Sequence, residues 1–150
     1  MKSITEDYKG FLSEIDYSHM VTIEPLPDKR MTLDNVKQSL REVEFKLNKF
    51  FLKRTWSKWK LLDRFFFIGF YEGKGLMRHH HLLLYSPKIY SHQYCSVKNF
   101  LYNHWTDRQP INVTEIYDSV GMTRYSSKEM TIHNDNFYLI NLVILLLNLI

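Results

Sequence analysis

The stretch "FFFIGFYEGKGLMRHHHLLLY", residues 65–85, decides the fold of this chain. Its first part, Phe65–Glu72, is mostly aromatic, and its last part, His79–Tyr85, runs into three leucines. Between them Gly73-Lys74-Gly75 has the composition of a turn, and Ser86-Pro87 ends the second run. The stretch therefore predicts two antiparallel strands, 65–72 and 79–85, joined by a short connection.

Segments on both sides of this hairpin extend the pattern. Before it, "HMVTIE" (His19–Glu24) predicts a strand, and apolar residues recur at helical spacing over Leu33–Arg54. After it, the sequence predicts a helix, a strand and a helix over 96–105, 112–117 and 119–130. The order β-α-β-β-α-β-α is typical of an α+β fold of the ferredoxin-like, split βαβ type, which is a mostly antiparallel sheet with helices on one face.

The length of 150 residues suits one domain with a buried core. We assign residues 1–136 to this domain and residues 137–150 to an apolar C-terminal segment without charged residues. The segment is shorter than the roughly twenty residues of a transmembrane helix, so we expect no membrane span. Packing, oligomerisation and a truncated reading frame are alternative explanations of the segment, and a homo-oligomer is left open. The single cysteine, Cys95, excludes an internal disulfide and favours a reducing, cytoplasmic location.

Positive charge is concentrated in one part of the chain. The net charge is +4, and seven lysines and arginines lie within residues 46–64, between Phe50, Phe51, Trp56 and Trp59. Basic groups bind phosphates and aromatic rings stack on bases, so this composition favours a single-stranded nucleic acid. A solvated helix face beside the core is the alternative. The candidate DNA-binding residues are Lys53, Arg54, Lys58, Lys60 and Arg64.

The three consecutive histidines suggest a metal site. Side chains alternate along a strand, so His79 and His81 share one face and His80 lies on the other. Glu72 ends the preceding strand, and antiparallel pairing brings its carboxylate near both histidines. Two imidazoles and a carboxylate can hold a divalent cation with positions open for substrate oxygens. One alternative is that these are surface histidines on an edge strand. A second is that the strand has the other register, in which His80 is the metal ligand.

The ligand set alone does not identify the metal. Zinc accepts two histidines and a glutamate, whereas magnesium prefers oxygen ligands, so Mg²⁺ or Mn²⁺ follows if the substrate is a phosphate. A second motif is "TRYSSKE", residues 123–129, in which Tyr125 and Lys128 share a face of the predicted helix. A phenol close to an ammonium group and a metal is a candidate nucleophile. A structural tyrosine is the alternative, since the chain has ten.

In combination and in chain order, these segments resemble the HUH endonuclease superfamily, in particular the rolling-circle replication initiators of small plasmids, phages and single-stranded DNA viruses. The resemblance covers roughly residues 18–130. One departure is His80, which stands where the family usually has a bulky apolar residue. The matching segments are the first-strand motif "HMVTI" (His19–Ile23), the acidic Glu72, the His-hydrophobic-His motif at His79-His80-His81, and the Y-x-x-K motif at Tyr125 and Lys128.

The resemblance implies nicking and strand transfer on single-stranded DNA at a replication origin. A Mg²⁺ or Mn²⁺ ion held by Glu72, His79 and His81 would polarise the scissile phosphate. Tyr125 would attack phosphorus, which leaves a 5′-phosphotyrosine and a free 3′-hydroxyl, and Lys128 would offset the developing charge. Host polymerase and helicase are the expected partners.

Two alternatives to this function are kept. Single-tyrosine transposases belong to the same superfamily, but their late-helix partner is typically glutamine, so Lys128 favours the initiators. A non-catalytic nucleic-acid-binding module on the same scaffold belongs to a different class, and a nicking assay separates it from the enzymes.

Overall fold

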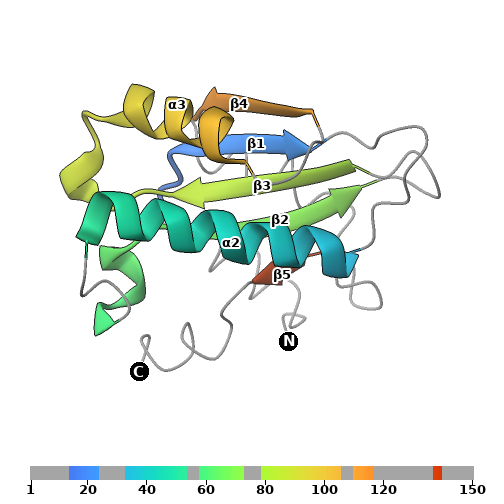
Figure 1. Cartoon of the computed structure of the whole chain (residues 1–150), viewed down its shortest axis with the longest axis horizontal. Coiled ribbons are helices and arrows are strands. Elements are labelled where there is room, and N and C mark those ends of the chain that lie inside the picture. The colour runs from blue at the N-terminus through green and yellow to red at the C-terminus, as the bar shows by residue number, and fades with distance from the viewer. Residues whose placement is uncertain are drawn as a thin grey trace.

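The computed structural model describes residues 14–23, 33–53, 58–72, 79–105, 110–116 and 137–139 of the chain. At Leu33, Leu61, 70–72, 79 and 137–139 only the backbone is described. The elements in chain order are β1 (His19–Ile23), α2 (Leu33–Leu52), the 3₁₀ turn η2 (Leu61–Asp63), β2 (Phe66–Glu72), β3 (His79–Tyr85), the 3₁₀ turn η4 (Lys88–Tyr90), α3 (Tyr94–His104), β4 (Ile111–Glu115) and β5 (Phe137–Leu139) (Figure 1).

The structure confirms the strands and helices predicted between residues 19 and 117, and none of their ends differs by more than two residues. The helix predicted over 119–130 lies outside the described residues. The sequence predicts no strand at the start of the apolar segment 137–150, whereas the structure forms the three-residue strand β5 there. Within the described part of the chain, no helix is long and apolar enough to cross a membrane.

The strands form one sheet in the order β4-β1-β3-β2-β5, and every neighbouring pair is antiparallel. Because β1 and β2 both pair with β3 in this way, they run parallel to each other on its two sides. The connection between them is α2, so β1, α2 and β2 form a βαβ unit split by β3. In the same way β3, α3 and β4 form a unit split by β1. The predicted α+β class is thus confirmed, and the sheet with its helices is consistent with a ferredoxin-like fold.

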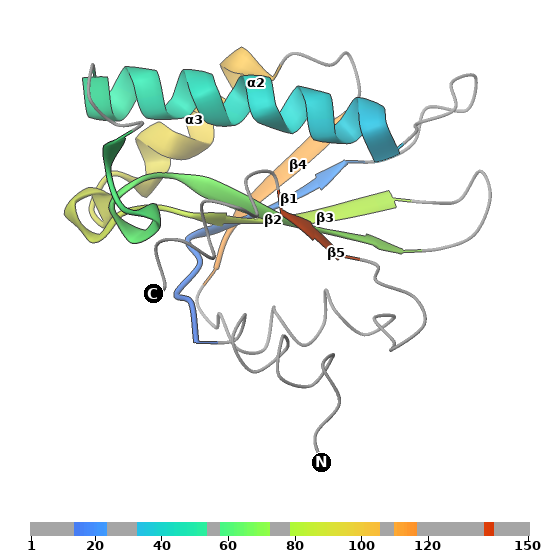
Figure 2. The same cartoon turned by 90° about the horizontal axis from the view of Figure 1, so that it is seen from below.

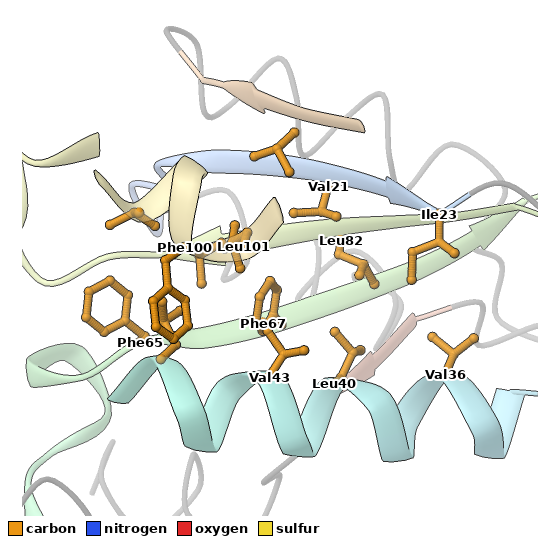
Figure 3. Close-up of a cluster of buried hydrophobic side chains, with 14 of the residues drawn as sticks. Val21, Ile23, Val36, Leu40, Val43, Phe65, Phe67, Leu82, Phe100 and Leu101 are labelled. Carbon is orange, nitrogen blue, oxygen red and sulfur yellow. The ribbon is translucent and has the colours of Figure 1, made fainter. Parts of the chain in front are cut away.

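Both α2 and α3 lie on one face of the sheet (Figure 2). The buried side of α2 follows helical spacing, since Val36, Leu40, Val43 and Leu47 are all fully buried. These side chains pack against the strands and α3 to form the main core (Figure 3). The strands and α3, together with Phe65 just before β2, contribute the other core residues, which are Val21, Ile23, Phe65, Phe67, Leu82, Leu84, Val97, Phe100, Leu101 and Val113.

The central strands are buried on their other face as well. Ile68 and Leu83 are directly paired and fully inaccessible, although they alternate with the residues that pack against the helices. Next to them the rings of Phe66 and Tyr85 stack at a centroid distance of 4.9 Å. Burial on both faces explains why β2 and β3 are continuous apolar runs instead of alternating apolar and polar residues.

A buried polar network joins β1, β3 and α3 near one end of the sheet. His19 is fully buried, and its Nε2–H donates to the carbonyl oxygen of Tyr94 at 3.0 Å. Nδ1 therefore accepts, and the Ser18 hydroxyl lies 2.7 Å from it and 2.6 Å from Ser86 Oγ. Burial lowers the pKa of His19 below its usual value of 6.5, although the Tyr94 carbonyl opposes this effect.

This neutral, buried histidine predicts that acid destabilises the fold. Between pH 6.5 and the lower pKa of folded His19, the unfolded chain binds one more proton than the folded chain. The free energy of unfolding should therefore fall as the pH drops below 6.5, by at most about 1.4 kcal/mol for each pH unit, until His19 of the folded chain is itself protonated. Urea unfolding between pH 7 and pH 5 measures the slope. His19→Asn should flatten it, and an unchanged slope in that variant would assign the effect to other groups.

Candidate metal centre and nucleic-acid interface

The hairpin end of β2 and β3 carries the residues predicted to bind a metal. The antiparallel register pairs Glu72 directly with His79, and His81 follows two residues later on β3. Residues paired across antiparallel strands share a face, as do residues two apart on one strand, so all three lie on the same face. Leu82 and Leu84 alternate with them and belong to the core next to α2 and α3. The candidate ligands therefore lie on the sheet face that points away from these helices.

His80 lies on the opposite face from His79 and His81. It is only 2% exposed, and its partner on β1, Ile23, belongs to the core. The alternation predicted from the sequence is thus confirmed, and His80 shares the helix-covered face with Leu82. The alternative register, in which His80 replaces its neighbours on the candidate metal face, does not occur in this strand.

Of the three candidate ligands, His81 is the one whose side chain the structure describes. It is 5% exposed, and the register places Thr22 of β1 directly beside it. Thr22 Oγ1 lies 3.4 Å from His81 Nδ1, which is longer than the roughly 2.7–3.2 Å that is usual for an N–H···O hydrogen bond. With Nδ1 directed at a hydroxyl, Nε2 is the ring atom suited to binding a metal.

The chemistry of the three residues fits a divalent cation. Two imidazoles and a carboxylate on one face form a ligand set with positions open for phosphate oxygens. Among the side chains that the structure describes, no group of three or more His, Cys, Asp or Glu is placed to hold a metal ion. The side chains of Glu72 and His79 lie outside that set. The metal centre therefore stays a prediction, based on the strand register and on the chemistry of its residues.

The predicted nucleophile and its partner, Tyr125 and Lys128, lie outside the described residues. Their position relative to the histidines is therefore not described, and their roles stay predictions. Another tyrosine, Tyr138, is placed by its backbone. It pairs with Gly69 in the middle of β2, several residues away from the hairpin end.

The predicted DNA-binding residues fall into different environments. Lys53, Lys58 and Lys60 are exposed, whereas Arg54 lies outside the described residues. Lys53 directly follows α2 and has a φ of 64°, so it ends the helix in the left-handed conformation that is usually taken by glycine.

Arg64 differs from the exposed lysines because its side chain is buried. It is 4% exposed, and burial lowers its pKa while the charge of Glu44 opposes that shift. Glu44 Oε2 also accepts from the backbone N–H of Phe67 at 3.4 Å. Arg64 therefore belongs to the junction between α2 and β2, and we leave it out of the nucleic-acid interface.

Aromatic side chains accompany the exposed lysines, as the sequence suggested, but not all of the expected ones do. Phe50 is 64% exposed and Trp59 is also exposed, whereas Phe51 packs against the core and Trp56 lies outside the described residues. Phe45 is exposed too, and the ammonium nitrogen of Lys49 lies 5.8 Å from the centroid of its ring. We call this set the basic aromatic surface; its members are Phe45, Lys46, Lys49, Phe50, Lys53, Lys58, Trp59 and Lys60.

The basic aromatic surface and the candidate metal face are on different parts of the molecule. The surface includes the C-terminal end of α2, which lies at the left of Figure 1, whereas β2 ends and β3 begins at the right. Both strands are seven residues long, so at about 3.3 Å per residue the two ends of the sheet are roughly 20 Å apart. One nucleotide cannot contact both places, so a strand bound at both would run along the molecule.

Neither family models, nor curated proteins, nor solved structures gave a match to this chain. The spacing of the sequence predicts Glu72, His79 and His81 as metal ligands, but it does not connect Thr22 with them. A signal is present in the sequence, because the motif "HMVTI" contains a single hydroxyl, that of Thr22. What the sequence lacked was the β1–β3 register, which pairs Thr22 with His81.

Proposed function

We propose that this chain is a metal-dependent endonuclease that nicks single-stranded DNA at a replication origin and initiates rolling-circle replication. The observation that supports it most strongly is the β2–β3 register, which pairs Glu72 with His79 and leaves His81 on the same face. This face belongs to a ferredoxin-like sheet, the fold that the resemblance to HUH endonucleases implies. We expect the enzyme to act in the cytoplasm with host polymerase and helicase.

The proposed reaction is a transfer of the 5′-phosphoryl end of DNA to Tyr125. A bond forms between phosphorus and the phenol oxygen, and the bond from phosphorus to the preceding 3′-oxygen breaks. The phenol loses its proton and the departing 3′-oxygen gains one, which leaves a 3′-hydroxyl. A Mg²⁺ or Mn²⁺ ion held by Glu72, His79 and His81 would supply positive charge next to the phosphate oxygens. Lys128, one turn away from Tyr125 on the predicted helix, adds a second positive charge.

A second candidate is a nucleic-acid-binding module without catalytic activity. The basic aromatic surface favours it, because exposed lysines and rings bind single strands without any metal. This candidate shares the substrate of the first and lacks only the covalent step. The two functions therefore differ in whether the DNA is cleaved and joined to the protein, and not in the affinity for single-stranded DNA.

The deciding experiment incubates the full chain with a randomised pool of end-labelled, single-stranded oligonucleotides. With Mn²⁺ present, we expect shortened products on a denaturing gel and a protein–DNA adduct that resists boiling in detergent. EDTA should abolish both signals. Binding of the pool with no cleavage and no adduct in either Mn²⁺ or Mg²⁺ would overturn the enzyme and leave the binding module.

The basic aromatic surface predicts a specific salt dependence. In the Lys58→Gln, Lys60→Gln double variant, we expect weaker binding of single-stranded DNA and a flatter plot of log affinity against log salt. Each phosphate contact on a single strand contributes about 0.7 to the slope, so the loss of two should reduce it by about 1.4. Fluorescence anisotropy with a labelled oligothymidine at several salt concentrations measures this change.

A matched control removes the same charge elsewhere. Lys37→Gln with Lys98→Gln changes one residue near the start of α2 and one on α3. This double variant should keep the slope of the unaltered protein. Equal slopes for both double variants would show that binding follows the net charge and not the basic aromatic surface.

A further inference from the structure

We infer that Thr22 is a positioning residue for the metal centre, which holds the imidazole of His81 so that Nε2 is presented to the cation. This inference rests on the proposed function, because it concerns a ligand of the same centre. It adds a residue on a different strand, one that donates no ligand atom itself. Its basis is the contact between Thr22 Oγ1 and His81 Nδ1 at 3.4 Å.

The fold brings Thr22 and His81 together through the pairing of β1 with β3. β1 and β3 pair antiparallel, and Thr22 stands directly opposite His81. Paired residues share a face, so the hydroxyl is on the same face as the candidate ligands and away from α2 and α3. Thr22 is half-buried and β-branched, and its χ1 angle is therefore restricted. A stiff side chain on a central strand can hold a neighbouring ring in one orientation.

The chemistry of a metal-bound imidazole explains what the hydroxyl would do. The nitrogen that binds the metal must carry a lone pair, so the proton of the neutral ring is on the other nitrogen. A group that accepts that proton fixes the tautomer and the orientation of the ring, and removal of such partners typically weakens metal binding by about 10- to 100-fold. In this chain the Thr22 hydroxyl would accept from Nδ1–H, and Nε2 would bind the cation.

His19 provides a contrast within the same strand. Its Nε2–H donates to the Tyr94 carbonyl and its Nδ1 accepts from Ser18, so its tautomer is the opposite of the one required of His81. His19 is also on the core face, because Val21, two residues further along β1, belongs to the core. The partners of His19 thus make it a structural residue, whereas the partner of His81 makes it suited to a metal.

The test measures Mn²⁺ binding to the full chain without DNA, by isothermal titration calorimetry. We expect Thr22→Val, which keeps the shape and removes the hydroxyl, to weaken Mn²⁺ binding by about 10- to 100-fold. Thr22→Ser, which restores the hydroxyl, should bind within a few-fold of the unaltered protein. Thr114→Val is the matched control, because Thr114 of β4 lies on the same face of the sheet as Thr22 and is exposed. It should leave the affinity unchanged.

A second measurement reads the tautomer directly. Long-range ¹H–¹⁵N spectra with bound Zn²⁺ should place the His81 proton on Nδ1 in the unaltered protein and in Thr22→Ser. In Thr22→Val the Nδ1 proton should exchange faster with water. If Thr22→Val is poorly folded by circular dichroism, Thr22→Ala serves the same purpose, since it also lacks the hydroxyl.

The outcomes separate this inference from the proposed function. If the unaltered protein binds neither Mn²⁺ nor Zn²⁺, the metal centre fails and the role of Thr22 fails with it. If the unaltered protein binds Mn²⁺ and the folded Thr22→Val or Thr22→Ala variant binds it equally well, the inference alone is overturned. A proton on Nε2 of His81 in the Zn²⁺ complex would overturn it as well.

Discussion

Phenylalanine in place of Tyr125 should abolish the covalent protein–DNA adduct and all strand cleavage. Only the nucleophilic oxygen is lost, so binding of single-stranded DNA and of Mn²⁺ should remain within a few-fold of the unaltered protein. In the unaltered protein, mass spectrometry of the digested adduct should find the oligonucleotide fragment attached through phosphate to Tyr125 alone. We expect this change to have the largest effect on activity, because no other group replaces the attacking phenol.

Two further tyrosines serve as controls for this result. Tyr117→Phe and Tyr138→Phe should each retain the adduct. Tyr138 in particular pairs with Gly69, which is the middle residue of β2 and lies three residues before Glu72. An adduct on Tyr117 or Tyr138, or one that persists in Tyr125→Phe, would show that a different residue is the nucleophile.

Alanine at His79 or His81 should reduce the nicking rate by at least about a hundredfold, because a metal contributes several kcal/mol of charge stabilisation and each 1.4 kcal/mol is a factor of ten. Mn²⁺ affinity in the absence of DNA should fall in parallel. The measurement is the single-turnover rate at saturating DNA, followed over a range of Mn²⁺ concentrations.

The histidine between them is a built-in control. His80 is on the helix-covered face, where it is buried with Leu82 and Leu84. His80→Leu should therefore change thermal stability while the nicking rate of the folded protein stays within about threefold. Normal activity in His79→Ala together with loss of activity in a folded His80→Leu variant would reverse the assignment of the ligands.

Local patterns were sufficient to predict most of the fold. The helical stripe of α2 and the strands β2 and β3 depend on neighbours in sequence, and the predicted ends of these elements lie within two residues of the observed ones. β5 was missed for a physical reason. Three residues that start a long apolar run carry no alternation and no turn, and only their pairing with β2 makes them a strand.

Only those features of the candidate site that depend on the spacing of residues within one strand can be predicted from the sequence. Alternation along one strand separates His80 from its neighbours without any knowledge of the fold. In contrast, Arg64 looked like part of a basic cluster, because its acidic neighbour Glu44 is twenty residues earlier and meets it only after α2 packs on β2. Thr22 was not linked to His81 for the same reason, since a register between distant strands cannot be read from either strand alone.

The position of β1 has a consequence for synthesis of the chain on the ribosome. Both strands that pair with β1, namely β3 and β4, follow it in the sequence, so β1 has no partner until residue 85 has been made. Thr22 and His81 are 59 residues apart, and their contact forms only with this late pairing. Non-local strand pairs form slowly, because closing a long loop costs entropy before contacts compensate for it. A nascent protein would therefore gain the proposed ability to bind metal, and with it any ability to cut DNA, only after its sheet has closed.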